Sequence, residues 1–543
     1  MKKALQLIFV FIVLFSTTFS LHAQNPYLPK NNEEVVMYQV NIRAFSENGT
    51  LAGVINRLDH IKDLGTNVIY LMPIFETEAS PYAATDYMKL DAEYGTVNDL
   101  TNLINQAHQK GMAVIMDIAT NHTGTNHVWL DDEIKNYWWY QQSHNTGEQG
   151  VHGPPPAHPG WTDVYQLDFD NADLRDTLIS VLKYWINTVD CDGFRFDYTD
   201  GQDVMLNDGN TDPSNFKFQF WKQVINELRG MQKDLLLLAE GDGNEYFELD
   251  FDLIYGNAFF YEFKNRIFTG NPVGGSMYYA NGFDFGATNG QLPIRFTANH
   301  DTHAHYGTPA QLFGGNKGQM SAFVVGAYMR GVPMIFSGQE VNTPESVPFY
   351  SKDVRGTINW SGLNGAIHQE YKNIIQLRKE SDAIKYGELT DFNNDDICAF
   401  MKKMGEEEVL VVANFRDGSR SVDIPQVARG EWRDAFTNSN ETVGGNMTME
   451  AFSYKVYRRG EVIAGNTGNE SNNSIQIYPN PAQNYVTVEN AGKLHRIYFY
   501  NNIGNLVKIS EEIKIDISDL DAGNYLLRIV TDTETITRSI VKQ

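Results

Sequence analysis

The stretch Gly193-Phe-Arg-Phe-Asp-Tyr-Thr-Asp200 decides the fold, and its first residues alternate as those of a short strand do. Arg195 and Asp197 are two positions apart, so they lie on the same face of that strand. A guanidinium beside a carboxylate keeps the carboxylate ionised and fixes its orientation, which suits a carboxylate nucleophile. A structural ion pair at a strand end is the other interpretation of this stretch, and the rest of the chain must decide between them.

Strand-like and helix-like segments alternate on both sides of this stretch. The segments with strand character are residues 35–40, 67–71, 113–118, 193–197, 235–239, 252–255, 294–297 and 333–336. Those with helical periodicity are residues 51–64, 100–110, 173–189, 216–228, 318–330 and 368–379. Repeated strand–helix units over about 350 residues indicate a parallel sheet, and an eight-fold barrel fits their number better than an open sheet. We therefore expect an α/β fold with a (β/α)8 TIM barrel over residues 30–382.

Four segments fall outside this alternation. Residues 122–167 are rich in Gly, Pro, His and Trp, which predicts a long loop or small subdomain inserted after the third strand. Beyond residue 381 the periodicity becomes two, which predicts an antiparallel β-sandwich over residues 384–463. Residues 464–474 are polar and lack apolar anchors, as a linker does, and a further small β-sandwich is expected over residues 475–543.

Composition excludes several classes of function. The chain has 543 residues, too many for one core, and a formal net charge of −25, which argues against a nucleic-acid partner. The two cysteines, Cys191 and Cys398, fall in different predicted domains, so a disulfide framework is excluded and a thiolate metal site is disfavoured.

The first residues have the character of an export signal. Lys2 and Lys3 precede an apolar run and the small-residue end at Ala23, which predicts a secretory signal peptide over residues 1–23. An uncleaved membrane anchor is the alternative. No later segment has the roughly 20 apolar residues that a transmembrane helix needs, so we expect none after signal removal.

Polar residues gather just past the predicted ends of barrel strands, where barrel enzymes place their reacting groups. They are Asp117, Asn121 and His122 after the third strand, Arg195 and Asp197 on the fourth, Glu240 after the fifth, and His300 and Asp301 after the seventh. Two carboxyls about 5–5.5 Å apart support double-displacement glycoside hydrolysis. Glu240 follows an apolar strand without an adjacent cation, so burial and neighbouring carboxylates should raise its pKa toward that of a general acid. Asp301 is placed to bind sugar hydroxyls.

With these motifs the chain resembles the α-amylase family of glycoside hydrolases over roughly residues 33–463. The matching segments, in the family's order, are residues 81–86, 94–96, 117–122, 166–170, 193–197, 240, 296–301 and 331–340. The resemblance implies that Asp197 is the nucleophile, Glu240 the acid/base and Asp301 the transition-state stabiliser. It also implies sugar-binding roles for four residues: Tyr82, His122, Arg195 and His300. Tyr82 would stack on the sugar, and the other three would contact the sugar or the nucleophile.

The implied activity is that of a retaining, endo-acting α-glucan hydrolase, which cleaves α-1,4-glucosidic bonds in starch-like polysaccharides or maltooligosaccharides. One departure affects the leaving-group subsites: many members carry a Lys-His pair three and four positions after the nucleophile, where this chain has Asp200 and Gly201. An α-glucan transglycosylase or a small-oligosaccharide hydrolase on the same scaffold is therefore an alternative. A non-catalytic glucan-binding homologue is the alternative from a different class.

The sequence offers candidate ligands for two kinds of metal site. The resemblance implies Ca²⁺ bound by Asn121 and Asp168, with a backbone carbonyl of Gly201 as a further ligand, and oxygen ligands suit this ion. The alternative is that Asn121 only ties down a loop by hydrogen bonds. His300, His303 and His305 suggest a zinc hydrolase instead, but that reading leaves Asp197 and Glu240 without a role.

The final segment resembles the C-terminal sorting domain of the type IX secretion route. The matching residues are Ile477-Tyr-Pro-Asn-Pro481, residues 498–504 and 516–525, and the end at Lys542. The resemblance implies export by the type IX secretion machinery and a secreted or cell-surface-attached protein. A carbohydrate-binding β domain is the alternative, and it would need exposed aromatic residues on one face.

Overall fold

The structure is a computed structural model that describes residues 25–132, 135, 139–140, 161–169, 171–199, 216–231, 233–267, 271–273, 290–351, 356–460, 476–489, 494–501, 506–510, 512–531 and 535–543. The predicted signal peptide, the predicted linker and the candidate ligand Gly201 lie outside the described residues.

Within the described residues, eight parallel strands close into a barrel in the order β1-β12-β11-β10-β9-β8-β5-β2. The strands are β1 (Met37–Val40), β2 (Val68–Leu71), β5 (Ala113–Ala119), β8 (Gly193–Asp197), β9 (Leu236–Ala239), β10 (Leu253–Tyr255), β11 (Leu292–Phe296) and β12 (Val332–Phe336). Their side chains are buried almost throughout, as expected for parallel strands covered on both faces, and Asp197 at the end of β8 is the half-buried exception. The predicted (β/α)8 barrel is confirmed.

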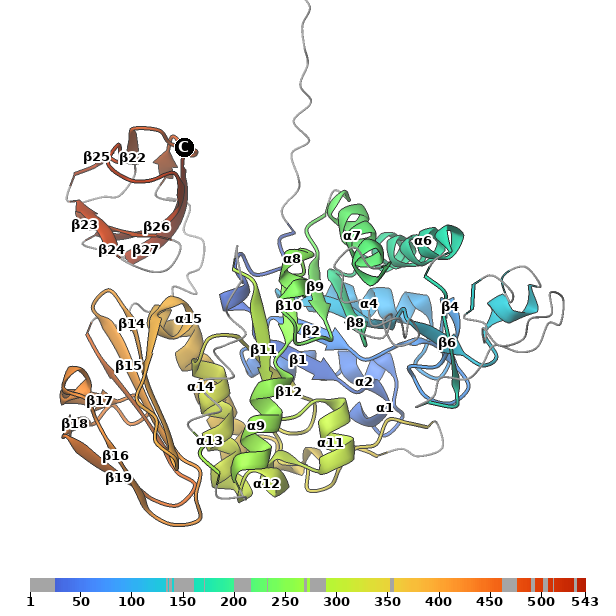
Figure 1. Ribbon diagram of the computed structural model, residues 1–543, viewed down its shortest axis with the longest axis horizontal. Helices are drawn as coiled ribbons and strands as arrows, with labels where there is room; N and C mark the ends of the chain where they lie inside the picture. Colours follow the sequence, from blue (N-terminus) through green and yellow to red (C-terminus); the bar gives the residue numbers. More distant parts are fainter. Residues whose placement is uncertain are drawn as a thin grey trace, which may run out of the picture.

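Helices surround this barrel (Figure 1). The longer ones are α4 (Val97–Gln109), α6 (Ala172–Val189), α7 (Phe216–Arg229), α9 (Asn257–Ile267), α13 (Gly315–Tyr328) and α14 (Ala366–Glu380). The shorter ones are α1 (Ile42–Phe45), α2 (Leu51–Ile55), α3 (Leu58–Asp63), α8 (Glu245–Glu248), α11 (His300–Tyr306), α12 (Pro309–Leu312) and α15 (Asp382–Tyr386). The sequence of α4 shows why such segments form: Thr96 and Asp99 make a capping box at its start, and one apolar stripe is buried.

The helix predicted over residues 51–64 is wrong in one respect, because the structure divides it into α2 and α3. The break is at Arg57, whose backbone is not helical. The guanidinium of Arg57 lies over the ring of Trp360, 4.0 Å from its centroid. Amphipathic periodicity reveals neither this tertiary contact nor the position of the break.

The segment inserted after β5 begins and ends in a short antiparallel pair. Strand β6 (His122–Gly124) pairs with β7 (Val164–Gln166), and His122 is the register partner of Gln166. A second hairpin, β3 (Phe75–Thr77) with β4 (Ala84–Leu90), lies beside it at the right of Figure 1. The two ends of the insertion are thereby held next to the carboxyl end of β5, where the candidate residues are.

Behind the barrel, the described residues form a sandwich of antiparallel strands with sheet orders β13-β14-β15-β20-β17-β18 and β16-β19. The strands are β13 (Glu388–Asp391), β14 (Ile397–Met404), β15 (Glu407–Asn414), β16 (Arg420–Asp423), β17 (Gly430–Asp434), β18 (Asn440–Val443), β19 (Asn446–Met449) and β20 (Tyr454–Arg459). Strand β15 is apolar on both faces because Val409 and Val411 join the core shared with the barrel, whereas Leu410 and Val412 pack inside the sandwich.

The C-terminal unit, at the upper left of Figure 1, is a second pair of antiparallel sheets. Its strands are β21 (Gln476–Tyr478), β22 (Tyr485–Glu489), β23 (Leu494–Asn501), β24 (Leu506–Ser510), β25 (Lys514–Asp516), β26 (Gly523–Thr531) and β27 (Thr535–Lys542). It has a core of its own, which includes Val486, Ile497, Phe499 and Leu527. Among the helices of the described chain, none combines the length and the apolar character that crossing a membrane requires.

Candidate active site

The candidate site is built around one fully buried guanidinium, that of Arg195. Its Nη1 donates hydrogen bonds to Asp117 Oδ1 at 2.8 Å and to Asp197 Oδ1 at 2.7 Å. Its Nη2 lies 2.7 Å from Glu240 Oε2. Strands β5 and β9 flank β8 in the barrel, and Asp117 is the register partner of Arg195. Three neighbouring strands therefore bring three carboxylates to one buried cation, which needs such partners.

The backbone that follows β8 binds the end of β9. The N–H of Tyr198 donates to Glu240 Oε2 at 2.6 Å, and the hydroxyl of Thr199 donates to the backbone carbonyl of Glu240 at 2.8 Å. Tyr198 has a φ of 44°, a left-handed conformation that is a genuine outlier for a bulky residue. This turn fixes the Glu240 carboxyl beside Asp197, because both are held by Arg195 and by adjacent residues.

Burial decides the protonation of this cluster. Burial raises the pKa of Glu240 well above its ordinary value, against the opposing charge of Arg195, and the negative charges of Asp197 and Asp301 raise it further. The expectation that Glu240 has no adjacent cation is wrong, since Arg195 lies against it, but the expected direction of the shift holds. Burial also raises the pKa of Asp117 to about 6, against the opposing charge of Arg195. Burial likewise raises the pKa of Asp301, again opposed by Arg195.

His300 connects Asp301 to Tyr82. The backbone N–H of His300 donates to Gln39 Oε1 at 3.3 Å, which turns the Gln39 Nε2 toward His300 Nδ1 at 2.8 Å. We therefore assign Nδ1 as the acceptor and the ring proton to Nε2. That nitrogen faces the Tyr82 hydroxyl at 2.7 Å and Asp301 Oδ2 at 3.2 Å. Burial lowers the pKa of His300 well below its ordinary value, so the ring is neutral and acts as a donor.

Tyr82 packs flat against His300, with ring centroids 5.2 Å apart, and its hydroxyl donates to Asp117 at 2.8 Å. His122 lies on the outer side of this tyrosine, where its Nε2 donates to the Tyr82 carbonyl at 3.0 Å. The structure thus places His122 against the backbone that carries Tyr82. Among the predicted sugar-binding residues, Arg195, His300 and Tyr82 surround the carboxylates directly.

The two predicted calcium ligands lie on neighbouring backbone. The N–H of Leu167, next to Asp168, donates to the carbonyl of Asn121 at 3.1 Å. Asn121 is fully buried, and neither atom of its side-chain amide has a hydrogen-bond partner among the described residues. A buried amide oxygen of this kind fits a hard cation, which accepts carbonyl and carboxylate oxygens.

The three histidines considered for zinc point to different partners. His303 Nδ1 accepts the N–H of Val347 at 3.1 Å, and His305 Nε2 lies 3.0 Å from the Tyr350 hydroxyl. In the described part of the chain, no group of three or more His, Cys, Asp or Glu residues is arranged to hold a metal ion.

Sequence reasoning missed several residues that shape the site. Gln39 orients His300. A polar amide within an otherwise apolar strand was the feature of the sequence that could have identified it. Tyr70 donates to Asp117 Oδ2 at 2.9 Å and lies 3.2 Å from the hydroxyl of Tyr255. The spacing of these two tyrosines does not identify them as site residues, because it is that of ordinary buried strand residues.

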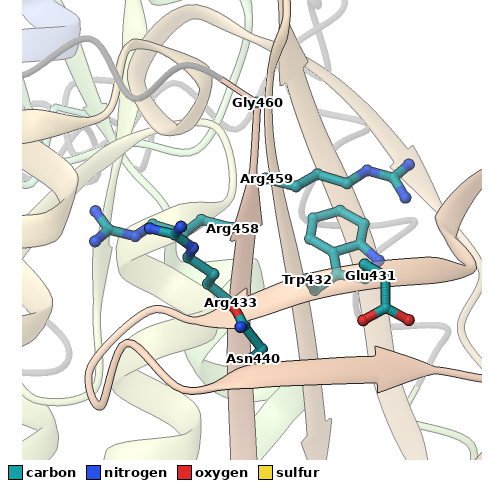
Figure 2. A pocket seen from close by; sticks show the side chains of 7 residues that line it. All are labelled: Glu431, Trp432, Arg433, Asn440, Arg458, Arg459 and Gly460. Carbon is teal, nitrogen blue, oxygen red and sulfur yellow. The ribbon is translucent and has the colours of Figure 1, made fainter.

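A separate hollow of about 540 Å³ lies on the sandwich, away from these residues (Figure 2). It is lined by Glu431, Trp432, Arg433, Asn440, Arg458, Arg459 and Gly460. The guanidinium of Arg459 covers the Trp432 ring at 4.0 Å and also pairs with Glu408 at 2.5 Å. These contacts indicate that Arg459 has a structural role in the sandwich.

Models of known families match three parts of the chain. The description "Alpha amylase, catalytic domain" matches residues 29–251, "Maltogenic Amylase, C-terminal domain" matches residues 388–456, and "Secretion system C-terminal sorting domain" matches residues 476–543. The first match contains the ends of β5, β8 and β9, and the last covers the C-terminal pair of sheets.

Similar proteins agree with these matches. The chain is 25% identical to Alpha-amylase 3 of Dictyoglomus thermophilum, over 75% of this chain and 89% of that protein. It is 26% identical to a cyclomaltodextrinase of Thermoanaerobacter pseudethanolicus, over 67% of this chain and 63% of that protein. Among solved structures, a noncanonic maltogenic alpha-amylase from Thermotoga neapolitana has the same fold, with a TM-score of 0.67 and 21% identity over 79% of this chain and 100% of that one.

Proposed function

We propose that this chain, which is a glycoside hydrolase of the α-amylase family with a type IX secretion sorting domain, hydrolyses α-1,4-linked glucans with retention of configuration. The observation that carries the proposal is the single guanidinium of Arg195, which holds the carboxylates of Asp197 and Glu240 side by side at the carboxyl end of the barrel. Double displacement requires two adjacent carboxyls, one of which acts as an acid, and the raised pKa of Glu240 suits that role.

In the proposed mechanism Asp197 attacks the anomeric carbon while Glu240 gives its proton to the glycosidic oxygen. The sugar is then held as an ester on Asp197 until water attacks, with Glu240 now taking the proton. Arg195 keeps Asp197 oriented, and the raised pKa of Glu240 keeps it protonated for the first step. Asp301, beside the Nε2–H of His300, is placed to bind sugar hydroxyls as positive charge develops on the ring.

For the substrate we propose starch-like polysaccharides and maltooligosaccharides cut at internal bonds. A second candidate is a hydrolase of small or cyclic oligosaccharides. It is favoured by the sandwich, which matches the C-terminal domain of maltogenic amylases, and by the cyclomaltodextrinase among the relatives. The two candidates share the chemistry and differ in the length of glucan that reaches Asp197.

One product analysis tests both the retention of configuration and the preferred substrate. Purified enzyme is incubated with starch, pullulan, maltotetraose, a cyclomaltodextrin and sucrose, and early products are separated by chromatography while NMR follows their anomeric form. Internal cleavage predicts a fast fall in starch chain length, with products first released as the α-anomer. Preference for maltotetraose or the cyclic glucan selects the second candidate, and β-anomeric products would contradict the retaining mechanism.

Calcium forms part of the proposal as a structural ion. Asn121 Oδ1 and a carboxylate oxygen of Asp168 would hold it, and its chemistry would be to tie the barrel to the inserted segment. The support is the fully buried Asn121 amide without a partner among the described residues.

A chelator should therefore lower thermal stability more than it changes the rate of the chemical step. A ligand bound only by the folded state stabilises it, by about 2.7 kcal/mol at a hundred times its Kd. The melting temperature is measured with and without excess chelator, on protein shown to be metal-free afterwards, and Asn121→Ala is the control that should no longer respond. An unchanged melting temperature would favour the alternative, in which Asn121 holds the loop and binds no ion.

The sorting domain indicates that the protein is secreted or attached to the cell surface. We propose that its partner is the type IX secretion machinery and that residues 1–23 are the signal peptide for the preceding export step.

A further inference from the structure

An exposed tryptophan stands at the edge of the site, at the end of the inserted segment. Trp161 is 45% exposed, although tryptophan is a large residue that folding normally covers. Its ring centroid lies 5.3 Å from that of Tyr198, edge to face at 89°, and 6.3 Å from that of His122. Tyr198 is the residue directly after Asp197. The two rings thus form a wall that begins beside the proposed nucleophile.

The backbone of Tyr198 supports a functional interpretation of this wall. A left-handed φ of 44° is strained for an aromatic residue, and such strain concentrates at active sites because the surroundings hold it there. In this conformation the N–H of Tyr198 points at the Glu240 carboxyl at 2.6 Å. The same residue therefore binds the proposed acid through its main chain and meets Trp161 through its ring.

This connection fixes the side of the sugar chain that the wall faces. Glu240 protonates the glycosidic oxygen in the proposed mechanism, so the sugar that leaves must lie next to Glu240. Tyr198 is bound to that carboxyl, whereas Tyr82 and Phe349 pack on His300 near Asp301. Because the Tyr198 backbone is bound to Glu240, we assign the wall to the side of the leaving sugar.

We propose that Trp161 and Tyr198 form the binding wall of the leaving-group subsite, with the indole of Trp161 stacking on a glucosyl ring and Tyr198 supporting it. Aromatic faces suit the apolar faces of neutral sugar rings, and the exposed Trp161 ring lies against the residue that follows the proposed nucleophile. The inference rests on the proposed function, because it assigns a subsite of the same reaction.

The wall has a consequence for glycosyl transfer. After the first step a sugar acceptor can occupy the same subsite as the departed sugar. Its 4-hydroxyl then attacks the anomeric carbon, the bond from that carbon to the Asp197 oxygen breaks, and the hydroxyl proton passes to the Glu240 carboxylate. Water needs no stacking partner for the same attack. The wall therefore favours transfer to glucose or maltose over hydrolysis.

The test compares two substrates that share the bound sugar and differ in the group that leaves. Maltotetraose releases a sugar from the leaving-group subsite, whereas α-maltosyl fluoride releases a fluoride ion. Trp161→Ala should lower kcat/KM about tenfold on maltotetraose, as loss of an aromatic stacking partner does, and less than twofold on the fluoride. Trp161→Phe should restore most of the loss. Tyr485→Ala removes a similarly exposed aromatic ring (46% exposed) from the C-terminal unit, and should change neither substrate.

Two further measurements complete the test. Tyr198→Asn removes the ring but keeps a residue that tolerates the left-handed conformation, and should shift the two substrates in the same pattern as Trp161→Ala. With concentrated maltotriose, both variants should form fewer transfer products for each sugar hydrolysed. Equal losses on both substrates, or no loss on maltotetraose, would overturn the inference. A wild-type enzyme that releases no fluoride from α-maltosyl fluoride would instead overturn the proposed function.

Discussion

Arg195 is the residue on which the candidate site depends. The alternation of the first stretch predicted that its guanidinium faces Asp197, and the structure adds Asp117 and Glu240 as further partners. A buried cation with three acidic partners is more than a strand-end ion pair needs, which favours the catalytic interpretation. Burial raises the pKa of Glu240 beside this cation, so the titration of Glu240 should be visible in the pH dependence of the rate.

The basic limb of the kcat/KM profile should belong to Glu240, because the general acid must be protonated and kcat/KM reports the free enzyme. The charge of Asp301 helps to raise the pKa of Glu240. Asp301→Asn removes that charge, so the pKa of Glu240 falls and the basic limb moves to lower pH. The shift is measured on the residual activity with maltotetraose, expected to be about 10²-fold lower. A limb that stays in place or moves to higher pH would contradict the assignment.

The sequence was sufficient to find the carboxylates but not the residues that orient them. Asp197 ends β8, Glu240 directly follows β9, and Asp301 lies in the first turn of α11, the helix after β11. The carboxyl ends of barrel strands meet at one edge. The role of Gln39 depends on β1 lying near the end of β11, and that of Tyr198 on a left-handed backbone. Both arise from three-dimensional packing, which no local pattern encodes.

At the scale of elements, two arginines lie opposite each other on neighbouring strands of the sandwich, β17 and β20. Arg433 is the register partner of Arg458 on one side and of Asn440 on the other. Both arginine side chains line the hollow drawn in Figure 2. Neither forms an ion pair with a carboxylate in the part of the chain that the structure describes. Like charges directly opposite each other destabilise a sheet.

Arg433→Glu should therefore stabilise the sandwich, because it replaces a repulsive cross-strand pair with an attractive one. Opposite-charge pairs of this kind contribute about 0.2–1 kcal/mol, so we expect a gain of about 0.5 kcal/mol in the free energy of unfolding. Urea denaturation of the full chain measures it, with Arg433→Gln as the neutral control that should fall between the two. A glutamate variant less stable than the glutamine variant would show that other charges dominate there.

Elements were predicted well where one periodicity runs without interruption. The barrel strands were recognisable because each is an apolar run followed by an amphipathic helix, and even the short β10 lay within its predicted range. The division of the segment over residues 51–64 was not predictable, because the apolar periodicity runs on through Arg57, whose side chain contacts Trp360 in the folded chain. These residues are far apart in the sequence, and only the folded chain brings them together.

At the scale of the whole molecule, the C-terminal unit has its own core and follows every proposed catalytic residue in the chain. Residues 24–463 should consequently hydrolyse glucans as well as the full chain does. In a host that uses the type IX route, this truncated enzyme should be active but retained in the periplasm. Specific activity of purified protein and its distribution between periplasm and exterior are the two measurements. Normal export with impaired activity would make the unit a substrate-binding module.

The most direct test of the account is to trap the sugar on Asp197. In Glu240→Gln, α-maltosyl fluoride can still react, since fluoride leaves without an acid, but the second step lacks its base. The protein should gain the mass of one maltosyl group, and mass spectrometry of its peptides should place that group on Asp197. The double variant with Asp197→Asn should gain nothing. A maltosyl group on another residue, or fast turnover without any labelled protein, would contradict the proposed double displacement.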